Sequence, residues 1–298
     1  MALIQTALSA RVGSPASIAS GEVPVWNGSA WVRSSVTTIG ATSLGSGTPT
    51  STKFLRGDSS WQTISSDGWN ADSTTWTFGA ADAPSYTVTA TGDFTGTISA
   101  GMKFQLTHSA STKYFIVTKT AFAAGDTTLT LYGGTDYTLA AGAITEVSYS
   151  THRAPYGFPL SPAKWTQTTT STSSDTQGTI TAGTWYNVGA RSLDIPIGIW
   201  RTEWYSVLYG DNDDTVALQV SCTLSTGDST ESDVDFTTSA YLDSGNTVFT
   251  MPATKAKILD LASKTTYYLN VRGDNTGATV GSKGDYGKVF IRAICAYL

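Results

Sequence analysis

The chain has 298 residues, of which 40 % are hydrophobic and only 14 % are charged, against a usual charged share of ~25 %. Its formal net charge is −5, and no segment gathers lysine and arginine into the basic stripe that attracts nucleic-acid phosphate. We therefore expect no nucleic-acid partner. No apolar run approaches the ~20 residues of a membrane span, so we expect no membrane insertion.

The chain has two cysteines, Cys222 and Cys295, and two histidines, His108 and His152. These numbers almost exclude the usual Cys/His zinc sites, and we expect no cofactor. The cysteines could form a disulfide or be two buried small hydrophobic residues, and we favour the second reading. We expect His108 to start a turn after a strand and His152 to begin a linker, neither of them catalytic.

Most of the polarity comes from serine, threonine, glycine and asparagine. Threonine, valine, tyrosine and tryptophan suit strands, while glycine, serine, asparagine and aspartate suit turns. This composition predicts an all-β chain, and its length favours two or three domains. We expect three regions, residues 1–66, 67–163 and 164–298.

Residues 1–66 contain short apolar runs broken by small residues and proline, and we expect an extended segment of β-hairpins. In residues 23–36, Asn27-Gly28 is a strong turn signal between two tryptophans. In residues 51–64, Gly57-Asp58 can turn before Trp61. An isolated hairpin is marginal in water. We therefore expect the tryptophans to pack between identical chains about an axis.

Residues 67–163 show alternation typical of strands with one buried face, for example at Tyr86 and Val88. This pattern predicts a small β-sandwich or barrel. Residues 153–165 hold three prolines, which excludes a central strand and favours an ordered linker. The expected strands are 75–80, 85–90, 102–108, 113–122, 127–134 and 143–150.

Residues 164–298 predict a jelly-roll-like β-sandwich head. A polar low-complexity stretch, residues 166–176, leads into it, and we expect the glycine-rich residues 272–287 to be a loop at its tip. Residues 255–264 could form a short helix, but we favour a strand. The expected strands are 183–195, 198–210, 215–226, 247–254, 255–263, 265–273 and 288–298.

Two stretches near the N-terminus carry a resemblance. GTPTSTKFLRGDSSWQTI, residues 47–64, resembles a short element repeated in phage tail fibres, and VWNGSAWV, residues 25–32, is similar to another tail-fibre and virion-protein element. The middle region resembles a domain of phage and prophage minor structural proteins. The end of the chain looks like the β-sandwich heads of some receptor-binding proteins. The resemblance of the middle region rests on GWNADSTTWTF, YTVTATGDFTGTISAGMKFQLTHSASTKYFIV, TTLTLYGGTDYTLAAGAI and YSTHRAPYGFP. The resemblance of the end of the chain rests on GTWYNV, IPIGIWRTEWYSV, TKAKILDLASKTTYYLNVRG and KVFIRAICAYL.

The resemblance implies an elongated, intertwined homotrimer in the phage virion, made in the host cytoplasm. Residues 1–66 would attach to other tail or virion proteins, and residues 164–298 would face a host cell-surface glycan or another receptor. It implies adhesion without catalysis on the phage tail. The alternatives are a capsid head fibre or decoration protein on the capsid exterior, and a small polysaccharide depolymerase.

Three features could suggest other chemistry. Arg56-Gly57-Asp58 spells the integrin tripeptide, but it lies inside the tail-fibre element and we interpret Gly57 as its turn. Two acidic clusters could bind calcium or hydrolyse glycosides, and we favour solvated loop charges. The clusters are Asp211, Asp213 and Asp214, and Asp228, Glu231, Asp233 and Asp235.

Saccharide binding combines an aromatic face with hydrogen-bonding side chains. We expect most head aromatics to be core or subunit interface, because aromatic side chains bury large areas. Tyr209, beside the acidic Asp211 loop, and Tyr286, in the glycine-rich loop, are the expected exposed pair. We therefore take Tyr209, Asp211 and Tyr286 as candidate ligand-binding residues.

Overall fold

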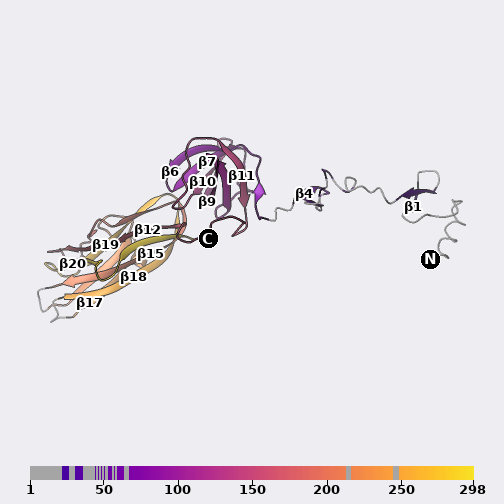
Figure 1. Cartoon of the computed structure of the whole chain (residues 1–298). Coiled ribbons are helices and arrows are strands. Elements are labelled where there is room, and N and C mark those ends of the chain that lie inside the picture. Colours follow the sequence, from indigo (N-terminus) through magenta and orange to yellow (C-terminus); the bar gives the residue numbers. More distant parts are fainter. Residues whose placement is uncertain are drawn as a thin grey trace, which may run out of the picture. The chain divides into compact units, whose positions relative to one another are not determined.

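A computed structural model describes residues 22–26, 31–35, 44, 46, 48, 50, 53–55, 57, 59–63, 67–212, 216–243 and 248–298. The chain forms two compact units, residues 1–66 and 67–298. The described residues contain many strands, one short 3-10 helix η3 (Val234–Phe236) and no α-helix. The predicted all-β class is confirmed (Figure 1).

Both predicted hairpins form in the first unit. Strands β1 (Glu22–Trp26) and β2 (Trp31–Ser35) pair antiparallel, with Trp26 opposite Trp31 in the register. Strands β3 (Lys53–Leu55) and β4 (Trp61–Thr63) form the second pair. The turn residues Asn27, Gly28, Arg56 and Asp58 lie outside the described residues, as do the side chains of Trp26 and Trp31, whereas the Trp61 side chain is described and half-buried.

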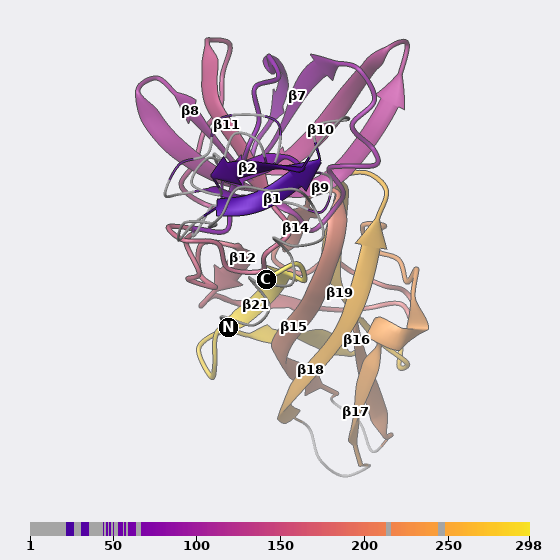
Figure 2. The same ribbon diagram turned by 90° about the vertical axis from the view of Figure 1, so that its right-hand side faces the viewer.

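Residues 67–150 form one curved antiparallel sheet of seven strands, in the order β5-β11-β8-β9-β10-β7-β6. Figure 2 shows this sheet as a curved layer above the head strands β15, β18 and β19. The strands are β5 (Asn70–Ala71), β6 (Thr77–Asp82), β7 (Ser85–Thr91), β8 (Lys103–His108), β9 (Ser111–Ala123), β10 (Asp126–Tyr132) and β11 (Ile144–Ser150).

Alternation explains why these residues form strands. Val88, Leu106 and Leu129 are fully buried on one face of the sheet, while their neighbours point to the other face. All six strands predicted in this region are present, and β5 adds a short edge. His108 is a buried final residue of β8 rather than the start of the following turn.

Residues 151–165 contain no strand, as the prolines predicted, and they are anchored by four buried residues, Pro155, Phe158, Lys164 and Trp165, although most of the others are exposed. Trp165 is fully buried, and its indole N–H donates to the carbonyl oxygen of Pro159 at 2.6 Å. The Phe158 ring stacks on Trp165 with ring centroids 5.0 Å apart. The segment is therefore an ordered connection.

Residues 164–298 form a sandwich of two antiparallel sheets, which confirms the predicted sandwich head. The larger sheet has the order β12-β21-β15-β20-β13, with β18 paired to β15. The smaller has the order β14-β19-β16-β17. The strands are β12 (Thr166–Ser171), β13 (Ser174–Gln177), β14 (Ser192–Ile195), β15 (Gly198–Asp211), β16 (Leu218–Ser225), β17 (Thr238–Leu242), β18 (Val248–Leu261), β19 (Thr265–Gly273), β20 (Thr279–Lys283) and β21 (Val289–Cys295).

Several predicted boundaries in the head differ from the structure. The polar stretch 166–176 holds strands β12 and β13, because its backbone groups pair with β21 and β20 although it has no apolar alternation. Residues 183–191 precede β14 without forming a strand. The two strands predicted at 247–254 and 255–263 are one strand, β18, over Val248–Leu261. For residues 255–264, the prediction that favoured a strand over a short helix is therefore confirmed.

Strand β18 accommodates a proline because, among the described strands, it pairs with β15 and no other. Its Pro252 lies opposite Val207. Proline has no N–H to donate and is therefore tolerated where one side of a strand has no ladder partner. The proline thus marks an edge of the larger sheet.

The curved sheet has a hydrophobic core of its own, but its residues Ile116 and Tyr132 belong to the hydrophobic core of the head. Tyr132 of β10 meets Trp200 of β15 edge to face, with ring centroids 4.9 Å apart. The Gln167 side-chain amide of β12 donates to the Tyr132 hydroxyl at 2.8 Å. Lys103 of β8 is buried, and its ammonium group donates to the carbonyl oxygen of Tyr297, near the C-terminal end of the head, at 2.6 Å. These contacts fix the two regions against each other within the second unit.

Candidate functional site

The outward face of the larger head sheet presents aromatic and charged side chains together. Along β15, the side chains of Trp200, Trp204 and Leu208 are buried in the core. Because strand side chains alternate, Tyr205 and Tyr209 lie on the opposite, outward face, and both are partly exposed. The two tryptophans therefore belong to the core.

An aromatic pair occupies the middle of this outward face. The register places Tyr205 of β15 opposite Phe290 of β21. Their rings stack with centroids 5.8 Å apart and an interplanar angle of 17°. The Arg292 guanidinium lies 4.5 Å from the Phe290 ring centroid and 3.3 Å from a carboxylate oxygen of Glu203. The pair thus has fixed hydrogen-bonding groups beside it.

Tyr209 and Asp211 lie together farther along β15. The Tyr209 hydroxyl donates to Oδ2 of Asp211 at 2.9 Å, and the Lys283 ammonium lies 4.2 Å from the Tyr209 ring centroid. Partial burial, followed by the hydrogen bond and negative charge of Asp211 and the nearby Tyr286 phenol, raises the pKa of Tyr209 above its usual value. The structure therefore brings Tyr209, Asp211 and Tyr286 into one neighbourhood.

Tyr286 lies in the short connection between β20 and β21, residues 284–288, rather than in a continuous loop over residues 272–287. Strands β20 and β21 are both neighbours of β15 on the same side. On their other side, β21 pairs with β12 and β20 pairs with β13. The connection between β12 and β13 is residues 172–173, whereas the connection between β20 and β21 is the longer segment 284–288. The longer segment carries Tyr286, whose side chain is 70 % exposed. The prediction of a tip loop is thus wrong over residues 279–283, which form strand β20.

Close packing explains the glycines of this region. A Cβ atom at Gly284 would lie 2.4 Å from the carbonyl oxygen of Ser173, and one at Gly281 would lie 2.4 Å from that of Asp175. Only glycine permits such approach without a shift of the backbone. The glycines therefore allow close contact between strands, where their abundance alone had favoured a loop at the tip.

The second acidic cluster is held by hydrogen bonds and ion pairs. Lys257 on β18 donates to Asp233 at 2.7 Å and to Asp235 at 2.9 Å, and the Thr237 hydroxyl donates to Glu231. Of the first cluster, only Asp211 is described. Within the described residues, no group of three or more His, Cys, Asp and Glu side chains could hold a metal ion.

Both cysteines are free and buried, as predicted. Cys222 is in β16 of the smaller sheet, and Cys295 ends β21 of the larger one. Burial raises the pKa of the Cys295 thiol to about 11. The thiols therefore remain protonated near neutral pH and act as small apolar core groups.

The sequence reasoning missed Phe290, Arg292 and Lys283 as parts of the outward face. A signal for the first two was present in the sequence: the charged Arg292 stands between the apolar Ile291 and Ala293, so in a strand it points outward, and by alternation Phe290 shares its face. The position of Lys283 beside Tyr209 depends on the pairing of β20 with β15, so no local sequence pattern could predict it.

No family model and no curated protein matches the chain. Among solved structures, the chain is similar to dimeric latent PorU from Porphyromonas gingivalis at 11 % identity and TM-score 0.25, covering 74 % of this chain and 24 % of that one. It is similar to the Gx strain structure of infectious bursal disease virus at 12 % identity and TM-score 0.25, covering 82 % and 68 %. It is similar to the VP2 subviral particle of the same virus at 12 % identity and TM-score 0.27, covering 81 % and 67 %.

Likeness at this level carries no functional argument, and the chain spans about a quarter of the PorU chain. Among the described residues, no helix is long and apolar enough to cross a membrane. The function is therefore inferred from the residues of the chain itself.

Proposed function

We propose that this protein is a non-enzymatic structural component of a phage virion, a homotrimeric tail fibre or receptor-binding protein that attaches to a host cell-surface saccharide. The observation that carries the proposal is the outward face of the larger head sheet. There, the stacked Tyr205 and Phe290 rings lie in the same sheet as the Tyr209–Asp211 pair and exposed Tyr286. Aromatic faces and fixed polar groups together suit sugar rings, which are apolar on their faces and polar at their edges.

The resemblance of residues 47–64 to tail-fibre elements supports the virion assignment. In this proposal, residues 1–66 attach the protein to other tail or virion proteins. Three heads on one trimer then bind repeated glycans on the host surface. Linked weak sites bind far more tightly than one site alone, so modest affinity at each face is sufficient for adsorption.

An adsorption competition tests the proposed face. The purified full chain is incubated with intact host cells before phage is added, and attached phage are counted. Tyr209→Ala and Tyr286→Ala should each weaken competition by roughly tenfold, the effect of losing about 1.4 kcal/mol per site. Tyr156→Ala is the matched control, because Tyr156 is 82 % exposed in the connection outside this face.

The outcomes separate the candidate functions. Equal competition by wild type, Tyr209→Ala and Tyr286→Ala would move the adhesive surface elsewhere. A folded wild-type protein that neither binds nor competes would overturn receptor binding and favour a capsid head fibre or decoration protein.

The molecular mass in solution tests the proposed trimer. Light scattering should give about 94 kDa, three times the 31.3 kDa of one chain. A mass of one chain would contradict the trimer.

A further inference from the structure

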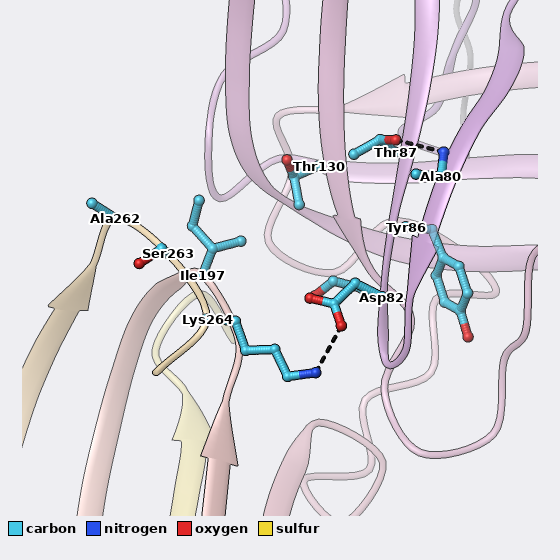
Figure 3. Close-up of a pocket in the computed structure, with 10 residues that line it drawn as sticks. Ala80, Asp82, Tyr86, Thr87, Thr130, Ile197, Ala262, Ser263 and Lys264 are labelled. Carbon is cyan, nitrogen blue, oxygen red and sulfur yellow. Dashed lines mark hydrogen bonds and ion pairs between the residues drawn. The ribbon is translucent and has the colours of Figure 1, made fainter. Parts of the chain in front are cut away.

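A second candidate site lies between the curved sheet and the head (Figure 3). It is a cavity of about 250 Å³, with Asp82, Ser85 and Thr87 on the side of the curved sheet and Ile197, Ser263 and Lys264 on the side of the head. It is below the size of a typical drug-sized ligand pocket, so any ligand must be small.

Ser85 is the feature that points to a ligand. Its side chain lines the cavity and is only 6 % exposed, and its hydroxyl has no hydrogen-bond partner among the residues that the structure describes. A buried hydroxyl without a partner costs ~1–3 kcal/mol. A hydroxyl group from a bound molecule would remove that cost.

The remaining polar groups offer both donors and acceptors. Lys264 pairs with Asp82 across the cavity at 2.7 Å, as Figure 3 shows. The Thr87 hydroxyl accepts from the backbone N–H of Ala80 at 2.8 Å, which leaves its own proton available. Because Asp82 and Lys264 neutralise each other, the cavity has no charge excess that would select an ion.

We propose that this cavity binds a small uncharged polyhydroxyl molecule, of the size of a single sugar ring. One ligand hydroxyl pairs with Ser85. Neighbouring hydroxyls donate to Asp82 and accept from Lys264, while the Ile197 side chain contacts the apolar face of the ring. A ligand held between the two walls also stabilises the joint of the curved sheet and the head, because it binds the folded arrangement alone.

Calorimetric titration of the full chain tests the proposal with D-glucose, D-galactose and N-acetyl-D-glucosamine. At least one sugar should bind with millimolar or better affinity. Ser85→Ala and Lys264→Met should weaken that binding by roughly five- to tenfold. Thr89→Ala is the matched control, because Thr89 follows two residues after Thr87 on the same face of β7 and does not line the cavity.

Thermal unfolding without sugar shows whether the variants fold. Ser85→Ala removes a hydroxyl that has no protein partner, so its melting temperature should equal or exceed that of wild type. If none of the three sugars binds, the cavity holds water only and the proposal is wrong. Binding that is unchanged in both cavity variants but lost in Tyr209→Ala would assign the sugar to the outward face instead, which leaves the proposed adhesion intact.

Discussion

At Gly281, two strands meet as closely as backbone atoms allow. The missing side chain lets β20 lie against β13, where a Cβ atom would come within 2.9 Å of the Thr176 Cα as well as close to the Asp175 carbonyl oxygen. Both neighbours are backbone atoms, which cannot rotate away as a side chain can. A side chain at this position would therefore push β20 away from β13.

Gly281→Ala should lower the free energy of unfolding by about 1–3 kcal/mol, the usual cost of overpacking. Urea unfolding measures the change. Gly96→Ala is the control, because a Cβ at Gly96 meets nothing within 4 Å, and its effect should stay within about 0.5 kcal/mol. Equal effects of the two substitutions would contradict the close strand contact.

The buried thiol of Cys295 predicts a pH dependence. Its folded-state pKa is raised from 9.0 to about 11, so between these values the unfolded chain has released the proton that the folded chain retains. The thiol's contribution is complete below pH 9 and is lost as the pH rises towards 11, by roughly 2 kcal/mol. Cys295→Ala should flatten this part of the stability curve. An identical slope in wild type and variant would place the alkaline sensitivity in other groups.

At the scale of elements, one asparagine fastens a loop to a strand. Asn270 of β19 is fully buried. Its side-chain amide donates to the carbonyl oxygens of Gly227 at 2.9 Å and Thr230 at 2.8 Å, and its oxygen accepts from the Ser229 N–H at 3.3 Å. The loop between β16 and η3 is thus held over the smaller sheet.

Asn270→Ala should destabilise the protein by about 2–4 kcal/mol, because it removes the three hydrogen bonds that this buried side chain makes. Chemical denaturation gives the magnitude, and limited proteolysis should cut the loop faster. Asn275→Ala is a suitable control, since among the residues that the structure describes the Asn275 amide makes one side-chain hydrogen bond, to Asn212 at 3.2 Å. A proteolysis rate equal to that of wild type would show that other contacts hold the loop.

Elements also differ in how well their sequence reveals them. In β7, β8 and β10, one face is buried and the other is not, so apolar alternation predicted them. Strands β12 and β13 alternate only between partly buried and exposed polar side chains. Their strand conformation comes from hydrogen bonds to β21 and β20, which are distant in the sequence.

At the scale of the whole second unit, aromatic packing joins the curved sheet to the head. Tyr132, Trp165 and Trp200 are all fully buried, and Tyr132 contacts both tryptophans through its ring. Either region alone would expose part of this cluster to water, at a cost that grows with the apolar area exposed. The unit of cooperative unfolding should therefore include both regions.

Trp200→Ala should lower stability by about 3–5 kcal/mol and should do so in both regions at once. Calorimetry of residues 67–298 is expected to show one transition for the wild type, which shifts as a whole in the variant. Thr172→Ala, in the exposed connection between β12 and β13, is a control that should leave the transition in place. Two separate transitions, with only the head affected by Trp200→Ala, would contradict a shared cooperative core.

The sequence by itself determined the all-β class, both N-terminal hairpins, six of the seven strands of the curved sheet and the burial of the two cysteines. It also proposed Tyr209, Asp211 and Tyr286 as one site. These features follow from local properties: side-chain alternation, turn residues and the scarcity of charge, all of which act between residues close in the chain.

Tertiary structure alone decided which residues accompany the site. Phe290 reaches Tyr205, and Lys283 reaches Tyr209, through pairings between strands more than seventy positions apart. It also decided that the glycine-rich segment enters the sheet, and that Asp82 and Lys264 enclose a cavity with Ser85. Such contacts depend on register and on the packing of distant layers, and no local pattern encodes either of them.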